Sequence, residues 1–466
     1  MNCKTLWSYE RYLPALGYEK GIYICRIVPM SHELRLDFIG DGSESYEVCY
    51  RKQAEGEDAA WRTVVTVCSP AILRGLDEGE EYTFYVRSQK GKSMPGLART
   101  GTAYGTVVNY LHPEDGKYAF SGHHLCTPSL LKHPNGYLLA SMDVFGRLTS
   151  QNLTLIFRSD DGGESWYHYS ELFPCFWGKL FLHNGDVYML STSTEYGDLL
   201  IGKSSDGGKT WDNPTVLLRG SCNSQAAGWH KSAMPIIEHR GRLWTGIDYG
   251  AWAIGGHANA LLSVACDADL LEAENWCISE PVPYDPAWSG SVDGDTRGFL
   301  EGNAVVLPNG EIANVLRYQT DKGTPNCGLI PILRGSCDRP DQKLVFEKYV
   351  PFEGNLSKFD ILFDDVSGYY YSVVCRIYDT EKPVTRNLLS LFRSPDLEKW
   401  ELVCDLLDSR EEDAQGVGYQ YVSFLFDGED LLYLSRTACN GAKSFHDNNY
   451  ITFHRLPNFR KIKEQA

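Results

Sequence analysis

The sequence lacks the features that mark a membrane protein, a metalloprotein or a disulfide-stabilised protein. Nowhere in its 466 residues is there an apolar run of 18, the length that crosses a bilayer as a helix. The first residues, MNCKTLWSYERYL, have no apolar core of the kind found in secretory signals. The 14 cysteines are scattered without a C-x-x-C pattern, so buried reduced thiols are expected. Together these absences predict a cytoplasmic protein.

Positive charge is also scarce. Lys and Arg number 44 against 61 Asp and Glu, which gives a formal net charge of −17. This balance argues against nucleic acid and against anionic membrane surfaces as partners. The sequence has no H-E-x-x-H, no EF-hand loop, no zinc spacing and no phosphate-cradling glycine loop. We therefore expect neither a metal nor a cofactor, and the sequence does not determine the oligomeric state.

What the sequence does contain is one eight-residue pattern that occurs twice, as SDDGGESW at 159–166 and SSDGGKTW at 204–211. In each copy the Asp can accept hydrogen bonds from turn amides, Gly can adopt positive φ, and Trp can pack beneath the turn. The pattern resembles the Asp-box, or BNR repeat, of the sialidase-like β-propellers. The resemblance implies an all-β fold in which these turns lie on the outer rim, away from the axial pocket.

The segment before these turns reads as a separate module. Residues 18–103 contain short alternating runs separated by turn residues, the spacing of a small β-sandwich. The runs LRGL at 73–76 and YTFYV at 82–86 resemble the fibronectin type III pattern with its tyrosine corner. A spacer or stabilising role is expected for this module, and carbohydrate binding is the alternative.

Residues 105–460 contain six repeats of an apolar run, a tight turn and a second apolar run. The turns read PNG, NG, RG, NG, DVSG and DGE, which are strong hairpin signals. A third apolar run follows every hairpin, and a fourth follows the first five. The run GTVVNY at 105–110 precedes the first repeat and is expected to supply the missing strand of the last one. We predict a six-bladed β-propeller preceded by a small β-sandwich.

The innermost strands of propeller blades surround the axis. Residues that begin a first strand or end a second strand should therefore face one central pocket. The residues at these positions differ from repeat to repeat. This favours a single active site, because a lectin usually repeats the same binding residues in every blade. First strands supply His123, His124, Trp177, Lys179, His230, Lys231, Glu301, Asn303, Gln420 and Tyr421. Second strands supply Asp143, Glu195, Asp248, Tyr249, Arg317, Tyr318, Arg376 and Arg436.

Three of these residues are arginines in the same seat of the last three repeats: Arg317, Arg376 and Arg436. Converging guanidinium groups match a planar carboxylate through bidentate hydrogen bonds. We therefore expect them to hold an acidic oligosaccharide. The alternative is that each pairs with a neighbouring carboxylate and joins blades.

The residues at these positions also resemble the active site of sialidases. In that family three arginines clamp the substrate carboxylate, a tyrosine activated by a glutamate attacks the anomeric carbon, and an aspartate is the acid/base. The resemblance implies that Tyr421 is the nucleophile, Glu301 its activating glutamate and Asp143 the acid/base, with Arg317 and Arg376 as two clamp members. Further substrate contacts are expected from Trp177, Lys179, Lys231, Tyr318 and Gln420.

One departure from that family bears on the substrate. Sialidases carry Arg-Ile-Pro where this chain has Cys126-Thr127-Pro128, so the first clamp arginine is missing and Arg436 is expected to substitute. A uronic acid then fits the pocket at least as well as a sialic acid. We predict an exo-acting, retaining glycoside hydrolase that cleaves at one of these acidic sugars.

Two alternatives stay open at this point. A polysaccharide lyase would cleave by β-elimination next to a uronate, with its base drawn from His123, His124, His230, Tyr249 and Tyr421. A non-catalytic sugar-binding propeller is the third possibility. The motif SFHDNNY at 444–450 is a further feature of the sequence, and no role is assigned to it.

Overall fold

The computed structural model describes residues 21–221, 225–292, 296–320, 328–355, 357–379 and 384–462. Within these ranges every regular element is a β-strand or a short 3-10 turn, and no helix is long and apolar enough to cross a membrane. The 3-10 turns are η1 (Gln53–Glu55), η2 (Gly116–Tyr118), η3 (Trp252–Ile254), η4 (Ala273–Asn275) and η5 (Phe459–Lys461). The strands form eight sheets, which confirms the all-β class.

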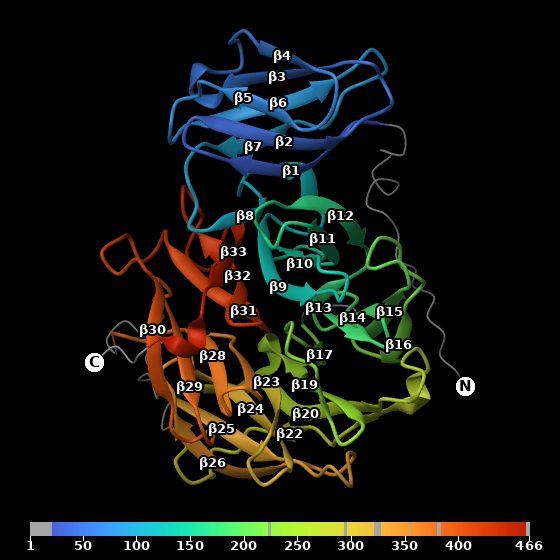
Figure 1. Ribbon diagram of the computed structural model, residues 1–466, viewed down its shortest axis with the longest axis vertical. Coiled ribbons are helices and arrows are strands. Elements are labelled where there is room, and N and C mark those ends of the chain that lie inside the picture. Colours follow the sequence, from blue (N-terminus) through green and yellow to red (C-terminus); the bar gives the residue numbers. More distant parts are fainter. Residues whose placement is uncertain are drawn as a thin grey trace.

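Two of these sheets form the amino-terminal unit, blue at the top of Figure 1. One holds β1 (Tyr23–Pro29), β2 (Glu33–Ile39) and β5 (Ala71–Arg74). The other holds β4 (Arg62–Thr66), β3 (Tyr46–Lys52), β6 (Glu81–Arg87) and β7 (Gly96–Arg99). Alternate residues of β6 are buried, and Phe84 and Val86 join Leu34 and Leu36 in one apolar cluster. The Tyr82 hydroxyl accepts a 2.9 Å bond from the backbone N–H of Asp77.

The other six sheets lie around a common centre in Figure 1. The first sheet holds β9 (His124–Lys132), β10 (Leu138–Phe145), β11 (Leu153–Ser159) and β12 (Tyr167–Leu172). The second holds β13 (Phe176–His183), β14 (Asp186–Thr192), β15 (Leu199–Ser204) and β16 (Thr215–Leu218). The third holds β17 (Gly228–His230), β18 (Ile237–His239), β19 (Arg242–Ala251), β20 (Gly256–Ala265), β21 (Trp276–Ile278) and β22 (Val282–Pro283). The fourth sheet holds β23 (Thr296–Val306), β24 (Ile312–Thr320), β25 (Leu329–Arg334) and β26 (Val345–Pro351). The fifth holds β27 (Asp360–Asp364), β28 (Tyr369–Cys375), β29 (Leu388–Ser394) and β30 (Glu401–Asp408). The last holds β31 (Gly418–Asp427), β32 (Asp430–Ala438), β33 (Tyr450–Leu456) and β8 (Thr106–Tyr110).

All six hairpins expected from the sequence are present. They are the antiparallel pairs β9/β10, β13/β14, β18/β19, β23/β24, β27/β28 and β31/β32. The early strand β8 pairs with the last strand β33, with Tyr110 opposite Tyr450. The predicted pairing between the run at 105–110 and the last repeat is therefore confirmed. Chain segments more than three hundred residues apart share one sheet.

Side chains also join the innermost strands of neighbouring sheets. The Ser129 hydroxyl accepts from the Leu180 N–H at 3.0 Å, and the Ser423 hydroxyl accepts from the Leu130 N–H at 3.1 Å. Small polar residues thus satisfy backbone groups that the sheets themselves leave unpaired. These two bonds tie β9 to β13 on one side and to β31 on the other.

The two eight-residue turns form as the sequence predicts. In the first, the Asp161 carboxylate accepts from the Ser159 hydroxyl at 2.8 Å and from the Ser165 N–H at 2.9 Å. Asp206 does the same with Ser204 and Thr210. The structure adds a third, degenerate copy at 394–400, which sequence reasoning missed because Leu397, at φ 68°, stands where the other copies have glycine.

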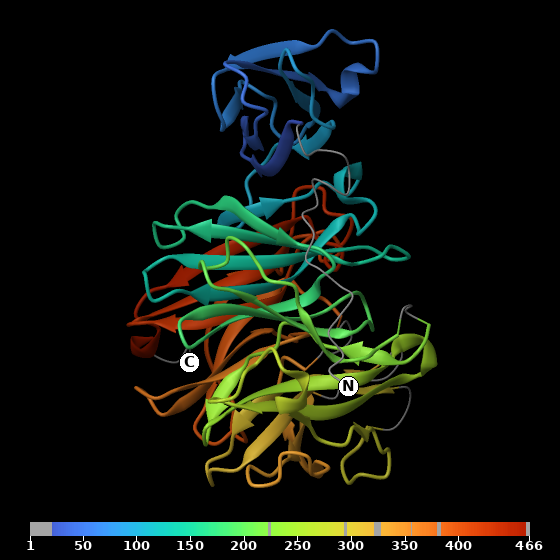
Figure 2. The ribbon, with the colours of Figure 1, turned by 90° about the vertical axis from the view of Figure 1, so that its right-hand side faces the viewer.

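The amino-terminal unit packs against the sheet that contains β8, and Figure 2 shows it projecting from the ring of sheets. Arg26 of β1 donates at 2.7 Å to the carbonyl oxygens of both Val107 and Val108 in β8. A third bond of 3.0 Å joins Arg26 to Asp37. The unit therefore holds the strand that completes the last sheet.

Candidate active site

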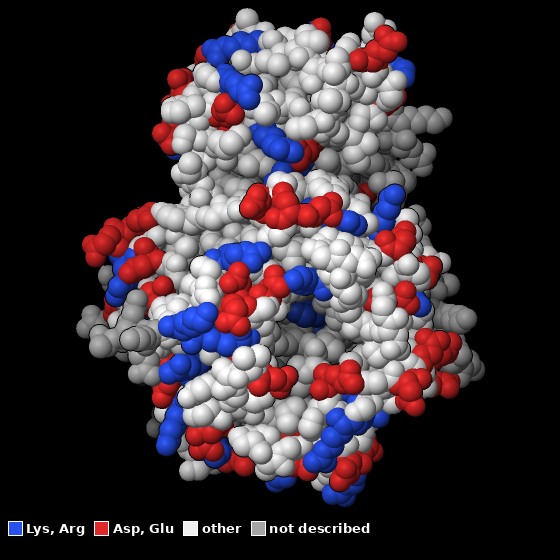
Figure 3. Space-filling view, viewed as in Figure 1, with Lys and Arg blue, Asp and Glu red and all other residues white. Residues whose placement is uncertain are grey.

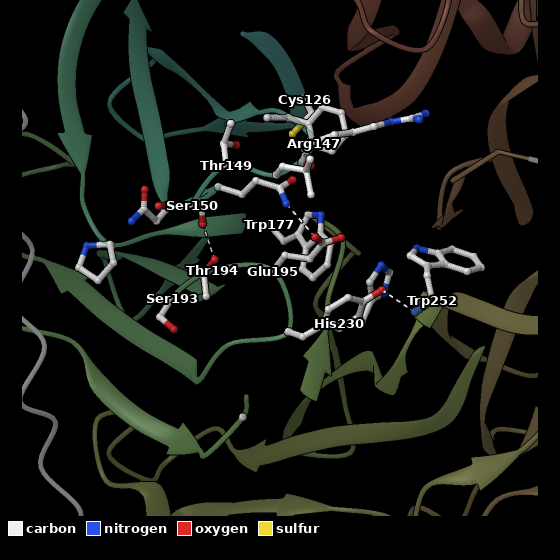
Figure 4. Close-up of a pocket in the computed structure, with 18 of the residues that line it drawn as sticks. Cys126, Arg147, Thr149, Ser150, Trp177, Ser193, Thr194, Glu195, His230 and Trp252 are labelled. Carbon is white, nitrogen blue, oxygen red and sulfur yellow. Dashed lines mark hydrogen bonds between the residues drawn. The ribbon is translucent and has the colours of Figure 1, made fainter. Parts of the chain in front are cut away.

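A cavity of about 1670 Å³ opens where the six sheets meet. Figure 3 shows this face hollowed at its centre, with Lys and Arg side chains at the rim and inside the hollow. Residues of the loops after β10, β14 and β19 line one side, and the starts of the innermost strands form the floor. Figure 4 shows Glu195 beside Trp177 and His230 in this cavity. The volume accommodates an oligosaccharide.

Four innermost strands present their cavity residue in the same unusual way. Thr127, Trp177, Glu301 and Tyr421 all have positive φ, between 46° and 54°, and each stands at a β-bulge in its hairpin register. All four line the cavity. A left-handed conformation costs a bulky residue about 1–3 kcal/mol, and such strain clusters at functional sites. The bulges re-aim four side chains from the sheet toward the axis.

Two of these strained residues are fixed by a buried aspartate on the preceding sheet. The Asp143 carboxylate accepts the Trp177 N–H at 2.9 Å, and the Asp248 carboxylate accepts the Glu301 N–H at 2.8 Å. Asp143 is fully buried, also accepts the Thr154 hydroxyl at 2.5 Å, and is not among the cavity-lining residues that the structure describes. The structure therefore places Asp143 behind Trp177, where it supports the cavity wall.

Glu301, Arg317 and Tyr421 form the centre of the site. Arg317 Nη1 lies 2.8 Å from Glu301 Oε2 and 3.3 Å from Tyr421 Oη, and a further bond joins Arg317 to Gln319. Burial acts to raise the pKa of Glu301, but the charges of Arg317 and His230 outweigh it and hold the pKa below its ordinary value. Glu301 is therefore an anion, and it shares Nη1 of Arg317 with the Tyr421 hydroxyl.

The arginines that gather at Tyr421 differ in one member from those expected. Arg436 and Arg386 lie over the Tyr421 ring at 5.1 and 6.0 Å from its centroid. Arg386 precedes β29 and donates to Gln420, so no strand-end pattern in the sequence pointed to it. Arg376 instead bonds Glu353 at 2.7 Å and lies 3.6 Å from Asp405. Arg376 therefore forms ion pairs with neighbouring carboxylates, as the alternative hypothesis expected, and does not join the expected clamp.

Glu195 is a second carboxyl group in the cavity wall. It is half-buried and accepts a 2.7 Å hydrogen bond from the Gln151 side chain, which Figure 4 draws as a dashed line. Burial raises the pKa of Glu195, whereas that of Glu301 is lowered. Paired carboxyl groups whose pKa values are pushed apart are typical of an acid and a base in one site.

The motif at 444–450 presents His446 to the cavity. His446 Nδ1 lies 2.8 Å from Asp447 Oδ1, and Arg436 ties the loop down through Asn448 Oδ1 at 2.7 Å and the His446 carbonyl. Burial lowers the pKa of His446 to about 4, so the imidazole is neutral near neutrality. Asp447 orients the ring, as carboxylates orient functional histidines elsewhere. The sequence showed this motif but not its position.

The remaining candidates fall into two groups. Trp177 and His230 line the cavity, and His230 Nδ1 lies 3.0 Å from Asp248 Oδ2. The others are not among the described cavity-lining residues: His123, His124, Lys179, Lys231, Tyr249, Tyr318 and Gln420. Tyr249 is exposed and packs on Trp229, whereas Tyr318 is buried and bonds Tyr284 at 2.9 Å. Among the described residues no cluster of three metal-ligating side chains occurs.

Comparison with known proteins gives structural but no sequence relatives. No family model and no curated protein matches the sequence. An α-L-arabinanase of Penicillium chrysogenum, solved with arabinobiose, aligns with a TM-score of 0.51 at 15% identity over 78% of this chain and 100% of that one. An α-L-arabinofuranosidase of Fusarium graminearum gives 0.52 at 14% identity over 78% and 99%. A Hadza microbial sialidase gives 0.50 at 11% identity over 94% and 98%. These proteins are β-propeller glycoside hydrolases, and at such identities the likeness is one of fold.

Proposed function

We propose that the protein is an exo-acting, retaining glycoside hydrolase that cleaves next to an acidic sugar of uronic or sialic type. The observation that supports an acidic sugar as the substrate is the position of Arg436, which is buried and lines the cavity. Its hydrogen-bond partners, Asn448 and the His446 carbonyl, are neutral, and the described residues offer it no ion pair within 4 Å. Asp447 acts on Arg436 through its charge without a direct contact, and a buried guanidinium that bonds no carboxylate favours an anionic ligand group.

The fold proposed for this function is a six-bladed propeller over residues 105–460, preceded by a fibronectin type III-like sandwich over 18–103. Six sheets around one centre and the β8/β33 pairing support the propeller. The two facing sheets and the Tyr82 hydroxyl bond support the sandwich. In this reading the turns at Asp161 and Asp206 are Asp-boxes, and they lie apart from the cavity residues.

In the proposed reaction Tyr421 attacks the anomeric carbon and forms a glycosyl-enzyme bond. Glu301 receives the phenolic proton, and Arg317 stabilises negative charge that develops on the Tyr421 oxygen. A neutral phenol meets less repulsion from a substrate carboxylate than an anionic nucleophile does. Water then hydrolyses the glycosyl-enzyme bond and the proton returns to Tyr421.

Glu195 takes the acid/base role in place of Asp143. It lines the cavity and has a raised pKa, so it can protonate the leaving oxygen and then, as a carboxylate, activate the incoming water. Asp143 is buried behind Trp177 and its oxygens already accept two hydrogen bonds. The assignment follows from exposure to the cavity.

The test is an activity panel of sialylated, uronate-containing and neutral arabinose oligosaccharides. New reducing ends with the acidic members alone would support the proposal. Equal cleavage of the neutral oligosaccharides would contradict the acidic specificity. The ultraviolet absorbance of an unsaturated uronate would show β-elimination in place of hydrolysis. Tight binding without any cleavage would identify a sugar-binding propeller.

A further inference from the structure

The cavity continues past Glu195, over the first and second sheets. Its walls there come from the loop between β10 and β11, the loop between β14 and β15, and the segments that precede β9 and β13. We call this part the outer arm, and define it by Phe120, 149–152, Phe173, Ser193 and Thr194, all of which line the cavity. The proposed reaction assigns no role to these residues.

Glu195 lies where the outer arm meets the centre of the site. In Figure 4, Ser193 and Thr194 lie on one side of Glu195, and His230 and Trp252 lie on the other. His230 belongs to β17 of the third sheet, whereas Ser193 and Thr194 directly follow β14 of the second. Glu195 therefore stands at the boundary between two parts of one cavity.

The position of the acid/base decides where the leaving group goes. In a retaining glycosidase the nucleophile and the acid/base flank the scissile bond. With Tyr421 of the last sheet as the nucleophile, the cleaved sugar lies at Tyr421 and the leaving oxygen lies at Glu195. The chain attached to that oxygen then continues away from Tyr421, over the first two sheets and into the outer arm.

The two ends of the cavity differ in charge. Arg436 lines the central end, where Figure 4 shows Arg147 beside Cys126. The residues that define the outer arm carry only hydroxyl, amide and apolar side chains. Asp198, which also lines the cavity, bonds Arg219 at 2.6 Å, so its charge is balanced. An acidic sugar is therefore favoured at the central end and a neutral sugar in the outer arm.

The outer arm is rich in hydrogen-bond acceptors. The Thr194 hydroxyl donates to the Ser150 carbonyl, so its oxygen keeps lone pairs for a ligand. Gln151 Oε1 and Asn152 Oδ1 are buried and accept no hydrogen bond from the described residues. Gln151 also has a φ of 48°, a strained conformation of the kind that clusters at functional sites. A ligand with several hydroxyl groups supplies the donors that this part of the cavity lacks.

An apolar corner completes the outer arm. The rings of Phe120 and Phe173 meet edge to face with their centroids 5.7 Å apart, and both side chains are half-buried. The apolar face of a sugar ring can pack against these rings while its hydroxyl groups bond at the edges. Apolar and aromatic walls with a few placed polar groups are typical of ligand sites.

We propose that the outer arm binds the leaving group, and that the leaving group is a neutral oligosaccharide. This placement rests on the proposed function, which sets the scissile bond between Tyr421 and Glu195. Glu195 gives its proton to the leaving oxygen as that oxygen separates from the anomeric carbon, and the freed hydroxyl belongs to the chain in the outer arm. The substrate is then an acidic sugar at the end of a neutral chain.

The test blocks the outer arm and compares two substrates that share the acidic sugar. Ser150 is exposed, so Ser150→Trp adds bulk to the arm without entering the protein core. One substrate is the glycosyl fluoride, whose leaving group needs no arm, and the other carries lactose. In Ser150→Trp, kcat/KM for the lactose substrate should fall about 10- to 100-fold, the value of one or two hydrogen bonds, and that for the fluoride less than about threefold. Equal losses, or no loss, would overturn the proposal.

Ala253→Trp is the matched control. Ala253 is also exposed and lines the cavity, but it follows Trp252, on the other side of Glu195 from Thr194. Its ratio of the two kcat/KM values should equal that of the unmodified protein. Thr194→Val, which removes one hydroxyl without adding bulk, replaces Ser150→Trp if that variant fails to fold, and it should lower the same ratio.

Direct binding separates the outer arm from the proposed reaction. Lactose and arabinotriose are titrated by calorimetry into the unmodified protein and both Trp variants. At least one sugar should bind the unmodified protein and Ala253→Trp, and should bind Ser150→Trp about 10-fold more weakly. Failure to cleave any acidic substrate would contradict the proposed function, and this titration would still decide whether the arm binds a neutral sugar. No binding of either sugar, or equal binding to Ser150→Trp, would overturn the outer arm as a sugar site.

Discussion

The backbone N–H of Glu301 donates a 2.8 Å hydrogen bond to the buried carboxylate of Asp248. The same carboxylate oxygen lies 3.0 Å from Nδ1 of His230, which also lines the cavity. One residue therefore fixes both a strained backbone position and an imidazole in the site. Asp143 and Trp177 repeat the relationship two sheets earlier. A carboxylate at the end of one sheet holds the left-handed residue of the next.

Asp248→Asn should lower turnover more than it changes substrate binding. An amide nitrogen cannot accept, so one of the buried donors that face this side chain loses its partner, at a cost of about 1–3 kcal/mol. Glu301 then loses its fixed position at Arg317, which also contacts the Tyr421 hydroxyl. Steady-state kinetics on the substrate found in the panel, with thermal unfolding of both proteins, measures the effect. A variant with full kcat would show that Asp248 does not position Glu301.

Arg317→Met and Arg376→Met should differ sharply in stability. Removing Arg317 leaves Glu301 buried without its counter-charge, which costs about 3–5 kcal/mol. Arg376 pairs with a half-exposed Glu353, so its loss should cost about 0–1 kcal/mol. Denaturant unfolding of the two variants makes the comparison. Equal losses would mean that the Glu301–Arg317 pair has no special role.

The pH dependence of kcat/KM should be bell-shaped. Burial raises the pKa of Glu195, which must be protonated to act as the acid, so activity falls as pH rises through that raised value. Burial acts to raise the pKa of Glu301 as well, but Arg317 and His230 lower it, so the acidic limb lies below the ordinary range. Glu195→Gln should remove the alkaline limb and most of the activity. An alkaline limb that persists in that variant belongs to another group.

His446→Ala should raise KM while kcat changes less. The neutral imidazole, with Nδ1 bound to Asp447, offers Nε2 as an acceptor to a sugar hydroxyl. Loss of that bond should weaken binding about 10-fold, the value of a typical hydrogen bond. Tyr249→Phe is the control, because Tyr249 is exposed and away from the described cavity lining. An unchanged KM in His446→Ala would remove His446 from the substrate site.

Much of the fold could be read from local patterns. Each hairpin turn lies between the two apolar runs that it joins, so pairing of neighbouring runs needs no knowledge of distant chain. The β8/β33 pairing could also be predicted from the sequence. The last repeat lacks a fourth strand, so its sheet has an unpaired edge, and the run at 105–110 is the strand that no other repeat uses. The third turn at 394–400 was not, since Leu397 replaces the glycine that marks the others.

The sequence by itself determined the all-β class, the six hairpins and two of the three Asp-containing turns. It also predicted six residues that line the cavity: Trp177, Glu195, His230, Glu301, Tyr421 and Arg436. Only the tertiary structure decided that Arg386 replaces Arg376 beside Tyr421, that Asp143 supports Trp177 behind the wall, and that His446 faces the cavity. The reason is physical. Hairpins depend on neighbouring residues, whereas the direction of a side chain at a bulge or in a loop depends on contacts with the next sheet.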